Sequence, residues 1–245
     1  MQNQVDIMTT TNEYKCTICK DTGYVDDFYG NIANTCECAV QRAINARTQL
    51  WITESNTTTL DRERFTFDNF KPEKQLTKKG INDAKMLIKL LKSWQEREIK
   101  LLTIIGGVGI GKTHLSIATL VKTIQTKCQQ GYYAPATEIA VKSREFEYNE
   151  AEMYRKKLQR VEWLVLDDVG VEHDPRGYMQ TFYHSIIDHR YSQQMQTLIT
   201  TNLKKDGKKK DSLLKRLGDR VVSRLNHKGV SLCFEADGQD IRKQD

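Results

Sequence analysis

The stretch TIIGGVGIGKTHLSIATL, residues 103–120, places a glycine-rich turn between an apolar run and an amphipathic one. Gly106, followed after four residues by Gly111, Lys112 and Thr113, fits the pattern GxxxxGK(S/T). Glycines let backbone N–H groups approach phosphates, the lysine reaches the β- and γ-phosphates, and the threonine hydroxyl can hold Mg²⁺. A simple strand-to-helix turn is the alternative. We predict a phosphate loop for ATP and Mg²⁺ made of Gly106, Gly107, Val108, Gly109, Ile110, Gly111, Lys112, Thr113 and His114.

Apolar runs and helical patterns alternate along most of the chain. Short runs at KLLTIIG, WLVLDDVG and QTLITTN are separated by helical segments at THLSIATLVKTIQTK and GYMQTFYHSIIDHRYSQQ, and a helix is expected over residues 75–97. This alternation indicates a parallel sheet covered by helices on both faces. The expected fold class is therefore α/β, of the nucleotide-binding type.

Two further runs end in polar residues that suit a phosphate site. WLVLDDVG predicts a buried strand ending at Asp167 and Asp168, with Asp167 as the Mg²⁺ residue and Asp168 as the group that deprotonates an attacking water. The alternative is that both carboxylates cap the next loop. Asn202 ends the run QTLITTN, where it can contact the water or the γ-phosphate, although an asparagine after a strand is often a turn residue.

Two arginines follow at helical spacing. Arg220 and Arg224 are four residues apart and share one face of a short helix. They are ordinary surface charges, an aspartate-paired cap, or an arginine finger that stabilises the phosphoryl charge in a neighbouring subunit.

The composition is that of a soluble protein. No apolar run approaches the roughly 18 residues that span a bilayer, and no signal sequence is apparent, so a cytoplasmic protein without membrane association is expected. Residues 1–64 carry 6 Lys and Arg against 9 Asp and Glu, and residues 65–245 carry 32 against 23. The basic larger part favours a phosphate-bearing partner such as nucleic acid.

Four of the six cysteines lie within the first 38 residues. Cys16, Cys19, Cys36 and Cys38 form a CxxC pair and a CxC pair on either side of a turn-rich, hairpin-like stretch. Two close pairs can bind one tetrahedral Zn²⁺, which would stabilise a segment too small to fold on apolar burial alone. Disulfides or unrelated free thiols are the alternatives.

The domain organisation follows from these patterns. AVQRAINARTQLWITE is expected to be a helix, and SNTTTLDRER, residues 55–64, a polar linker with few residues able to pack. We therefore expect a zinc-binding module and linker over residues 1–60, and an ATPase domain over residues 61–245.

The order of motifs resembles one group of known proteins. RFTFDNF, GGVGIGKTHL, LVLDDVG, LITTN, GDRVVSRL and a terminal GQDIR, over residues 63–242, are similar to the DnaC/DnaI/IstB branch of AAA+ ATPases. CxxC followed by DTGYV and a closing CxC resembles the zinc-bearing front modules of DnaI-type and phage-encoded helicase loaders.

The resemblance implies specific roles. Lys112 and Thr113 become the Walker A pair, Asp167 and Asp168 the Walker B pair, and Asn202 sensor 1. Arg224 best matches the arginine finger, with Arg220 supporting the subunit contact; Asp240 replaces a serine that the group has before a terminal arginine, here Arg242.

The resemblance also implies partners. They are a hexameric replicative helicase, single-stranded DNA and further copies of the chain, in a bacterial or phage-infected cytoplasm. Phe146, Tyr148 and Tyr154 are candidates for base stacking, with packing in a helix as the alternative, and KKDGKKKD at 204–211 is a candidate phosphate contact. An IstB-type transposition helper and a binding module with structural ATP are the competing functions.

Overall fold

The computed structural model describes residues 14–26, 32–144, 148–172, 174, 177–204, 212–238 and 240. The chain divides into two compact units, Met1–Gln49 and Leu50–Asp245. Among the described residues, no helix has the length and apolar character needed to cross a membrane.

The first unit contains a small hairpin and most of a long helix. Strands β1 (Tyr24–Asp26) and β2 (Ile32–Thr35) pair antiparallel, and helix α1 (Glu37–Glu54) begins directly after them and runs on into the second unit. The hairpin and the helix agree with the sequence predictions. They bring the cysteine pairs before β1 and after β2 close together.

The second unit is built on a parallel sheet. Its five described strands lie in the order β4-β5-β6-β3-β7. Their bounds are β3 (Leu101–Gly106), β4 (Gly131–Pro135), β5 (Trp163–Asp167), β6 (Gln196–Thr201) and β7 (Ser231–Ala236). The predicted α/β fold with a parallel sheet is confirmed. β4, at one edge, is a strand that the sequence analysis did not identify.

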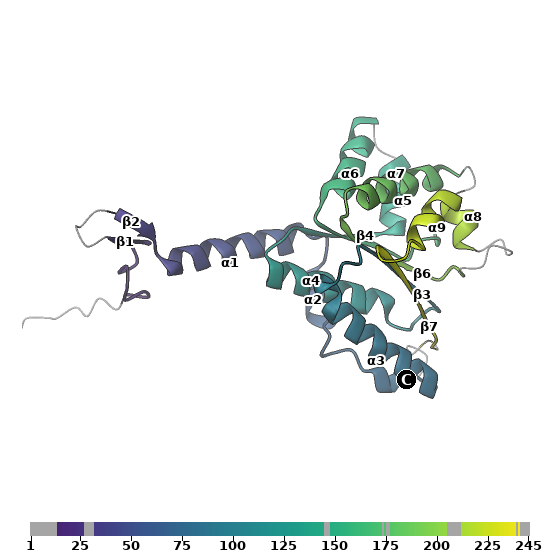
Figure 1. Cartoon of the computed structure of the whole chain (residues 1–245), viewed down its shortest axis with the longest axis horizontal. Coiled ribbons are helices and arrows are strands. Elements are labelled where there is room, and N and C mark those ends of the chain that lie inside the picture. Colours follow the sequence, from purple (N-terminus) through teal and green to yellow (C-terminus); the bar gives the residue numbers. More distant parts are fainter. Residues whose placement is uncertain are drawn as a thin grey trace, which may run out of the picture. The chain divides into compact units, whose positions relative to one another are not determined.

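Helices cover both faces of this sheet (Figure 1). One face carries α5 (Ala136–Arg144), α6 (Tyr148–Arg160), α7 (Tyr178–Ser192), α8 (Leu213–Leu217) and α9 (Asp219–Leu225). The other face carries α3 (Lys78–Ser93), α4 (Lys112–Lys127) and the short helix α2 (Thr59–Arg64). Single turns η1 (Pro72–Lys74) and η2 (Trp94–Glu96) flank α3.

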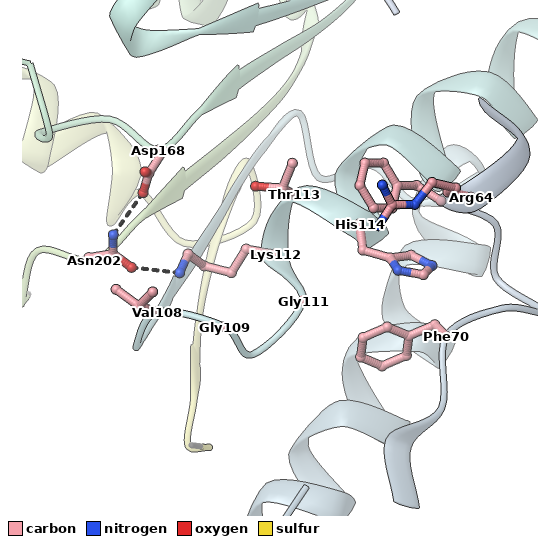
Figure 2. Close-up of a pocket in the computed structure, with 11 residues that line it drawn as sticks. Arg64, Phe70, Val108, Gly109, Gly111, Lys112, Thr113, His114, Asp168 and Asn202 are labelled. Carbon is pink, nitrogen blue, oxygen red and sulfur yellow. Dashed lines mark hydrogen bonds between the residues drawn. The ribbon is translucent and has the colours of Figure 1, made fainter. Parts of the chain in front are cut away.

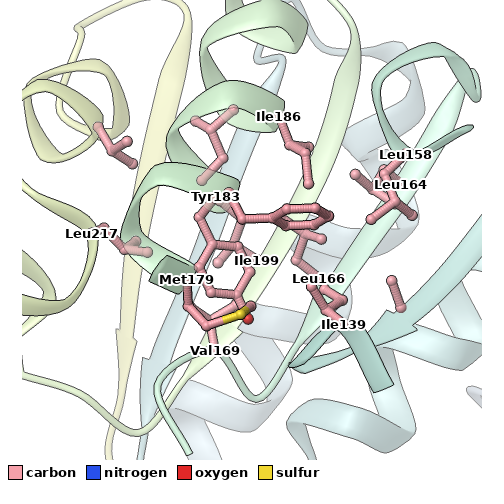
Figure 3. Packing of buried hydrophobic residues seen from close by; sticks show 14 of the residues in the cluster. Ile139, Leu158, Leu164, Leu166, Val169, Met179, Tyr183, Ile186, Ile199 and Leu217 are labelled. Atoms are coloured by element: carbon pink, nitrogen blue, oxygen red, sulfur yellow. The ribbon is translucent and has the colours of Figure 1, made fainter. Parts of the chain in front are cut away.

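Two apolar cores lie on opposite faces of the sheet. On the α7 face, Tyr183 and Ile186 point towards Leu166 and Ile199 of the sheet (Figure 3), and all four are fully or almost fully buried. On the α3 face, Trp94 packs edge-on against Trp163 with ring centroids 5.4 Å apart. A sheet with both faces covered explains why its central strands are continuous apolar runs.

The predicted linker at residues 55–64 is wrong. Ser55 and Thr57 are buried, and the carbonyl oxygen of Ser55 accepts a 2.8 Å hydrogen bond from the N–H of Tyr133 in β4. The rest of the segment is α2, which begins with a capping box between Thr58 and Asp61. The segment covers the free edge of β4 and satisfies backbone groups that an exposed edge strand leaves unpaired.

Candidate nucleotide-binding site

The carboxyl ends of β3, β5 and β6 bring the predicted phosphate-site residues to one edge of the sheet. The phosphate loop follows β3, Asp167 ends β5, and Asn202 follows β6. β6 lies between β3 and β5, so Asn202 stands between the loop and Asp168. This is the edge where open α/β sheets bind ligands.

Lys112 lies at the centre of the site. Its Nζ donates to the carbonyl oxygens of Gly106 and Gly107, at 2.9 and 2.8 Å, and to Oδ1 of Asn202 at 2.7 Å. The side chain is buried, and three acceptors offset the cost of burying its charge. The ammonium group therefore points into the loop that would receive phosphates (Figure 2).

Glycines give the phosphate loop its shape at two positions. Gly109 and Gly111 have φ values of 78° and 95°, in the left-handed region that favours glycine. A Cβ atom on Gly111 would lie 2.2 Å from the ring of Phe70, which therefore packs directly on the loop. A side chain at Gly111 is excluded on both grounds.

Asp167 accepts hydrogen bonds from three hydroxyl groups. Thr113 Oγ1 donates to its Oδ2 at 2.7 Å, Tyr133 Oη to the same oxygen at 2.8 Å, and Thr200 Oγ1 to its Oδ1 at 2.6 Å. Burial, followed by the charge of Asp167, raises the pKa of Tyr133, so the phenol stays protonated as a donor. A buried carboxylate beside a threonine hydroxyl is an oxygen donor set that suits Mg²⁺.

Asp168 has an unusual backbone conformation with φ of 57°. Its N–H donates to Thr200 Oγ1 at 2.8 Å, and its Oδ1 accepts a 2.8 Å hydrogen bond from Nδ2 of Asn202. Asn202 thus joins Asp168 to Lys112 in one hydrogen-bonded chain (Figure 2). The arrangement holds the Asp168 carboxylate towards the cavity that it lines.

The cavity has a volume of about 410 Å³. On the side away from Asp168 it is lined by Arg64, Phe70 and His114 (Figure 2), and Phe65 also lines it. Burial lowers the pKa of His114, and its Nε2 lies 2.7 Å from the carbonyl oxygen of Thr66, so the neutral ring donates there. The two phenylalanine rings lie 5.2 Å from the imidazole, and the three rings form a wall suited to a planar base.

Three residues that the sequence did not predict contribute to this site. Thr200 and Tyr133 reach Asp167 from the two neighbouring strands, and Phe70 packs on the phosphate loop. The apolar pattern of RFTFDNF was a usable signal for Phe70. No local signal marks Thr200 or Tyr133, because the register between strands sets their positions.

The two arginines lie outside the residues that line this cavity. Both are on α9; Arg220 is exposed, whereas Arg224 is partly buried. Arg224 forms an ion pair with Asp188 of α7 and lies 5.5 Å from the centre of the Tyr191 ring. Their predicted role towards a neighbouring subunit stays a prediction.

Other predicted contacts have separate outcomes. Tyr154 is 8% exposed and its ring packs 6.4 Å from that of Tyr132, so packing rather than base stacking describes it. Phe146, Arg242 and residues 205–211, and the side chain of Tyr148, lie outside the described residues.

The four N-terminal cysteines form a cluster. Their Sγ atoms all lie within 4.8 Å of one another, with Cys19 and Cys38 at 3.3 Å and Cys16 and Cys36 at 3.8 Å. Four thiolates bound to one Zn²⁺ at about 2.3 Å are about 3.8 Å apart, whereas a disulfide needs about 2.05 Å. The cluster therefore fits a zinc site and contains no disulfide.

The surroundings of the cluster favour a thiolate at Cys19 but not at Cys38. The N–H of Gly23 donates to Cys19 Sγ at 3.4 Å, and Arg42 donates to Cys38 Sγ at 3.7 Å. Burial opposes ionisation of Cys19, but the N–H of Gly23 and the neighbouring thiols lower its pKa to about 6. The hydrogen bond with Cys19 raises the pKa of Cys38 to about 12, so a cation is needed for all four to ionise.

Comparison with known proteins agrees with this geometry. The family model for IstB-like ATP binding proteins matches residues 56–245. A curated relative, the chromosomal replication initiator protein DnaA of Latilactobacillus sakei subsp. sakei (strain 23K), is 25% identical over 181 residues. These cover 71% of this chain and 38% of the relative, so the chain spans well under half of that protein.

Solved structures give the same grouping. The DnaC helicase loader is 26% identical with a TM-score of 0.56, over 71% of this chain and 98% of that chain. DnaI is 17% identical with a TM-score of 0.55, over 73% and 94%, and this likeness concerns the fold alone.

Proposed function

The chain belongs to the IstB-like ATP-binding family, in the DnaC/IstB branch of AAA+ ATPases, and from this premise we propose that it loads a hexameric replicative helicase onto single-stranded DNA. The observation that carries the proposal is the four-cysteine cluster at the front of the same chain. A metal-stabilised module beside an ATPase domain supports a protein whose front end binds another protein. The similarity to a DnaC helicase loader supports a helicase as that partner.

The site residues support ATP hydrolysis. Bound Mg²⁺ would neutralise phosphate charge, with Thr113 and Asp167 as its holders. Lys112 would exchange the carbonyls of Gly106 and Gly107 for phosphate oxygens, since an ammonium group is a donor with three N–H bonds. The Asp168 carboxylate would take the proton of the attacking water.

Asn202 and the arginines complete the proposed roles. Asn202 orients Asp168 through its amide N–H, and its amide oxygen accepts a hydrogen bond from Lys112. A movement of either side chain would therefore change the position of Asn202. Arg224, with Arg220 beside it, would act on ATP held by a neighbouring copy. The chain thereby couples hydrolysis to self-association. Zn²⁺ on the four cysteines would hold the front module in shape.

A binding assay tests the proposal. The full chain and a variant lacking residues 1–49 are each mixed with the host's purified replicative helicase, with and without ATP. Residues 50–60 are kept because they belong to the second unit, in which Ser55 bonds to β4. We expect the full chain to bind in an ATP-sensitive way and the shortened chain to lose the interaction. Equal behaviour of both, or no binding by the full chain, would rule out a helicase loader of this kind.

The family match itself favours a second candidate, an IstB-type transposition helper. Such a protein acts on duplex target DNA. Binding to single- and double-stranded oligonucleotides of equal length, with ATP present, separates the two functions. Preference for duplex DNA together with ATP-dependent filaments would favour the transposition helper. Preference for single strands would favour the loader.

A further inference from the structure

The loop after Asp168 contains a buried acid that the proposed chemistry does not use. The side chain of Glu172 is 1% exposed, and its Oε2 accepts a 2.8 Å hydrogen bond from the N–H of Gly170. Burial raises the pKa of Glu172, against the lowering effects of nearby backbone N–H groups and of Arg216. Burying a carboxylate this deeply costs a large free energy of desolvation unless a cation pairs with it.

That cation comes from α8. Nε of Arg216 lies 3.5 Å from Oε1 of Glu172, and its Nη2 donates to the carbonyl oxygens of Gly170 and Glu172, at 2.9 and 2.5 Å. One guanidinium group therefore holds both the acid and the backbone of the loop. The planar fork of arginine makes this possible, because its N–H groups point in several fixed directions at once.

The loop leaves little room for adjustment. Asp168 and Gly170 both have positive φ values, and a Cβ atom on Gly170 would lie 2.4 Å from the side chain of Leu203. Val169 is tied to β6 through its N–H, which donates to the carbonyl oxygen of Thr200. β6 therefore holds Asp168 and Val169 on one side, and Arg216 holds the next part of the loop, Gly170 and Glu172, on the other.

Arg216 and the two predicted finger arginines lie on adjacent helices that pack in the same core. Gly218 alone separates α8 from α9, and Leu217 and Val221 on either side of it are fully or almost fully buried in the same core. Arg216 faces the loop of its own chain, while Arg220 is exposed on α9. We therefore expect a shift of α9 to move α8, and Arg216 with it.

We propose that Arg216 is a positioning residue that couples docking of a second copy of this chain on α9 to the placement of the Asp168 carboxylate. The inference rests on the proposed ATPase and on its self-association. It assigns to Arg216 a role that neither the arginine finger nor the Walker B aspartates supply. Glu172 is the anchor that keeps Arg216 in this position.

A second arginine provides a matched control. Nη2 of Arg144 at the end of α5 lies 3.2 Å from Oδ1 of Asp174, whose side chain is 3% exposed. The pair therefore joins a buried acid of the following segment to a helix, as Arg216 does, but to a helix without predicted contact with a neighbouring subunit. Arg144→Lys and Arg216→Lys both keep the charge and remove the fork.

Steady-state ATP hydrolysis by the full chain tests the proposal. The two variants are compared with wild type over a range of protein concentrations, at a temperature where circular dichroism shows all three folded. Arg216→Lys is expected to keep its ATP affinity within about twofold and to lower kcat about 10- to 100-fold, as misplacement of a reacting group does. Its specific activity should also no longer rise with protein concentration. Arg144→Lys should retain both the rate and the rise. Unchanged kcat in Arg216→Lys, or equal losses in both variants, would overturn the proposal.

Hydrogen exchange separates this test from the proposed function. In wild type, the peptides that contain residues 168–172 and 219–225 should become protected together when the protein concentration rises. In Arg216→Lys, protection of 219–225 should persist while that of 168–172 is lost. If wild type hydrolyses no ATP, the proposed function fails. Hydrogen exchange then tests by itself whether docking on α9 is coupled to the position of Asp168. Parallel protection in both proteins would then refute it.

Discussion

Lys112 is buried at the phosphate loop, and its ammonium group is hydrogen-bonded within the chain. Two backbone carbonyls and the Asn202 side chain accept its three hydrogen bonds. The side chain is therefore already extended towards the phosphate position, and little conformational entropy would be lost on binding. The same network makes Asn202 a neighbour of both the lysine and Asp168.

Replacing Lys112 by alanine should weaken ATP binding. The change removes hydrogen bonds to charged phosphate oxygens, each worth about 1.5–3 kcal/mol, so affinity should fall about 10- to 100-fold or more. Titration calorimetry with a non-hydrolysable ATP analogue measures it. Lys122→Ala, an exposed lysine on the same helix, is the control and should bind as wild type does. Equal affinity of all three proteins would contradict the assigned phosphate loop.

The backbone of Asp168 suggests a contrast between two substitutions. Asparagine adopts left-handed φ values readily, so Asp168→Asn should fold normally and bind ATP, but lose about 100-fold or more in kcat because the amide accepts no proton. Asp168→Glu keeps the charge but places a longer side chain at φ 57°, where glutamate is disfavoured, and it should also be slow. Phosphate release under saturating ATP measures both. A fully active Asp168→Asn would exclude Asp168 as the base.

Sequence reasoning reached the residues of this site that belong to local motifs. Lys112, Thr113, Asp167 and Asn202 each follow an apolar run, and the structure brings them together. Thr200 and Tyr133 could not be found in this way. Their hydroxyls reach Asp167 across strand neighbours, and pairing between distant strands leaves no mark in a short stretch of sequence.

At the scale of elements, the spacing of apolar residues predicts helices that bury one face and strands that are buried on both faces. The helix expected over 75–97 appears as η1, α3 and η2, and the three apolar runs are central strands. GYYAP was not identified as a strand because glycine and proline bound it and only one neighbour pairs with it. The polar residues at 55–57 have the composition of a linker, but Ser55 and Thr57 are buried, and the carbonyl oxygen of Ser55 accepts a hydrogen bond from the edge strand.

The elements around α7 meet at one buried arginine. Arg190 is fully buried, and its guanidinium donates to the carbonyl oxygens of Leu158, Val161, Glu162 and Gln196 and to the Thr197 hydroxyl. These acceptors end α6 and begin β5 and β6. One side chain thus satisfies several carbonyls that helix and strand ends leave unpaired.

Arg190→Met should lower the free energy of unfolding by about 3–5 kcal/mol, because several buried carbonyls lose their donor together. Urea denaturation followed by circular dichroism measures this value. Arg160→Met, at an exposed position near the end of α6, is the matched control and should change stability by about 0.5 kcal/mol or less. A loss no larger than that of the control would show that water replaces the guanidinium without cost.

At the scale of the whole molecule, the cysteine cluster predicts a metal content. The purified chain should contain one zinc ion, measured by atomic emission, and Cys36→Ser should lose it and lower the melting temperature of the first unit. Affinity for ATP should be unchanged, because residues 50–245 have their own cores. Cys128→Ser, which alters a cysteine outside the cluster, should keep the zinc. A wild-type chain without metal, purified in the absence of chelators, would contradict the zinc assignment.

The place of β3 in the sheet has a consequence for how the protein is made. β3 lies between β6 and β7, so Leu101 pairs with Thr197 on one side and Ser231 on the other. The ribosome completes β3 and the phosphate loop long before either neighbouring strand exists. Pairing of strands that lie so far apart in the sequence is slow, and the unpaired edges of β3 are exposed until it occurs. A nascent chain therefore carries the full phosphate-binding motif while residues 114–236 are still being added, before β6 and β7 can hold β3 between them.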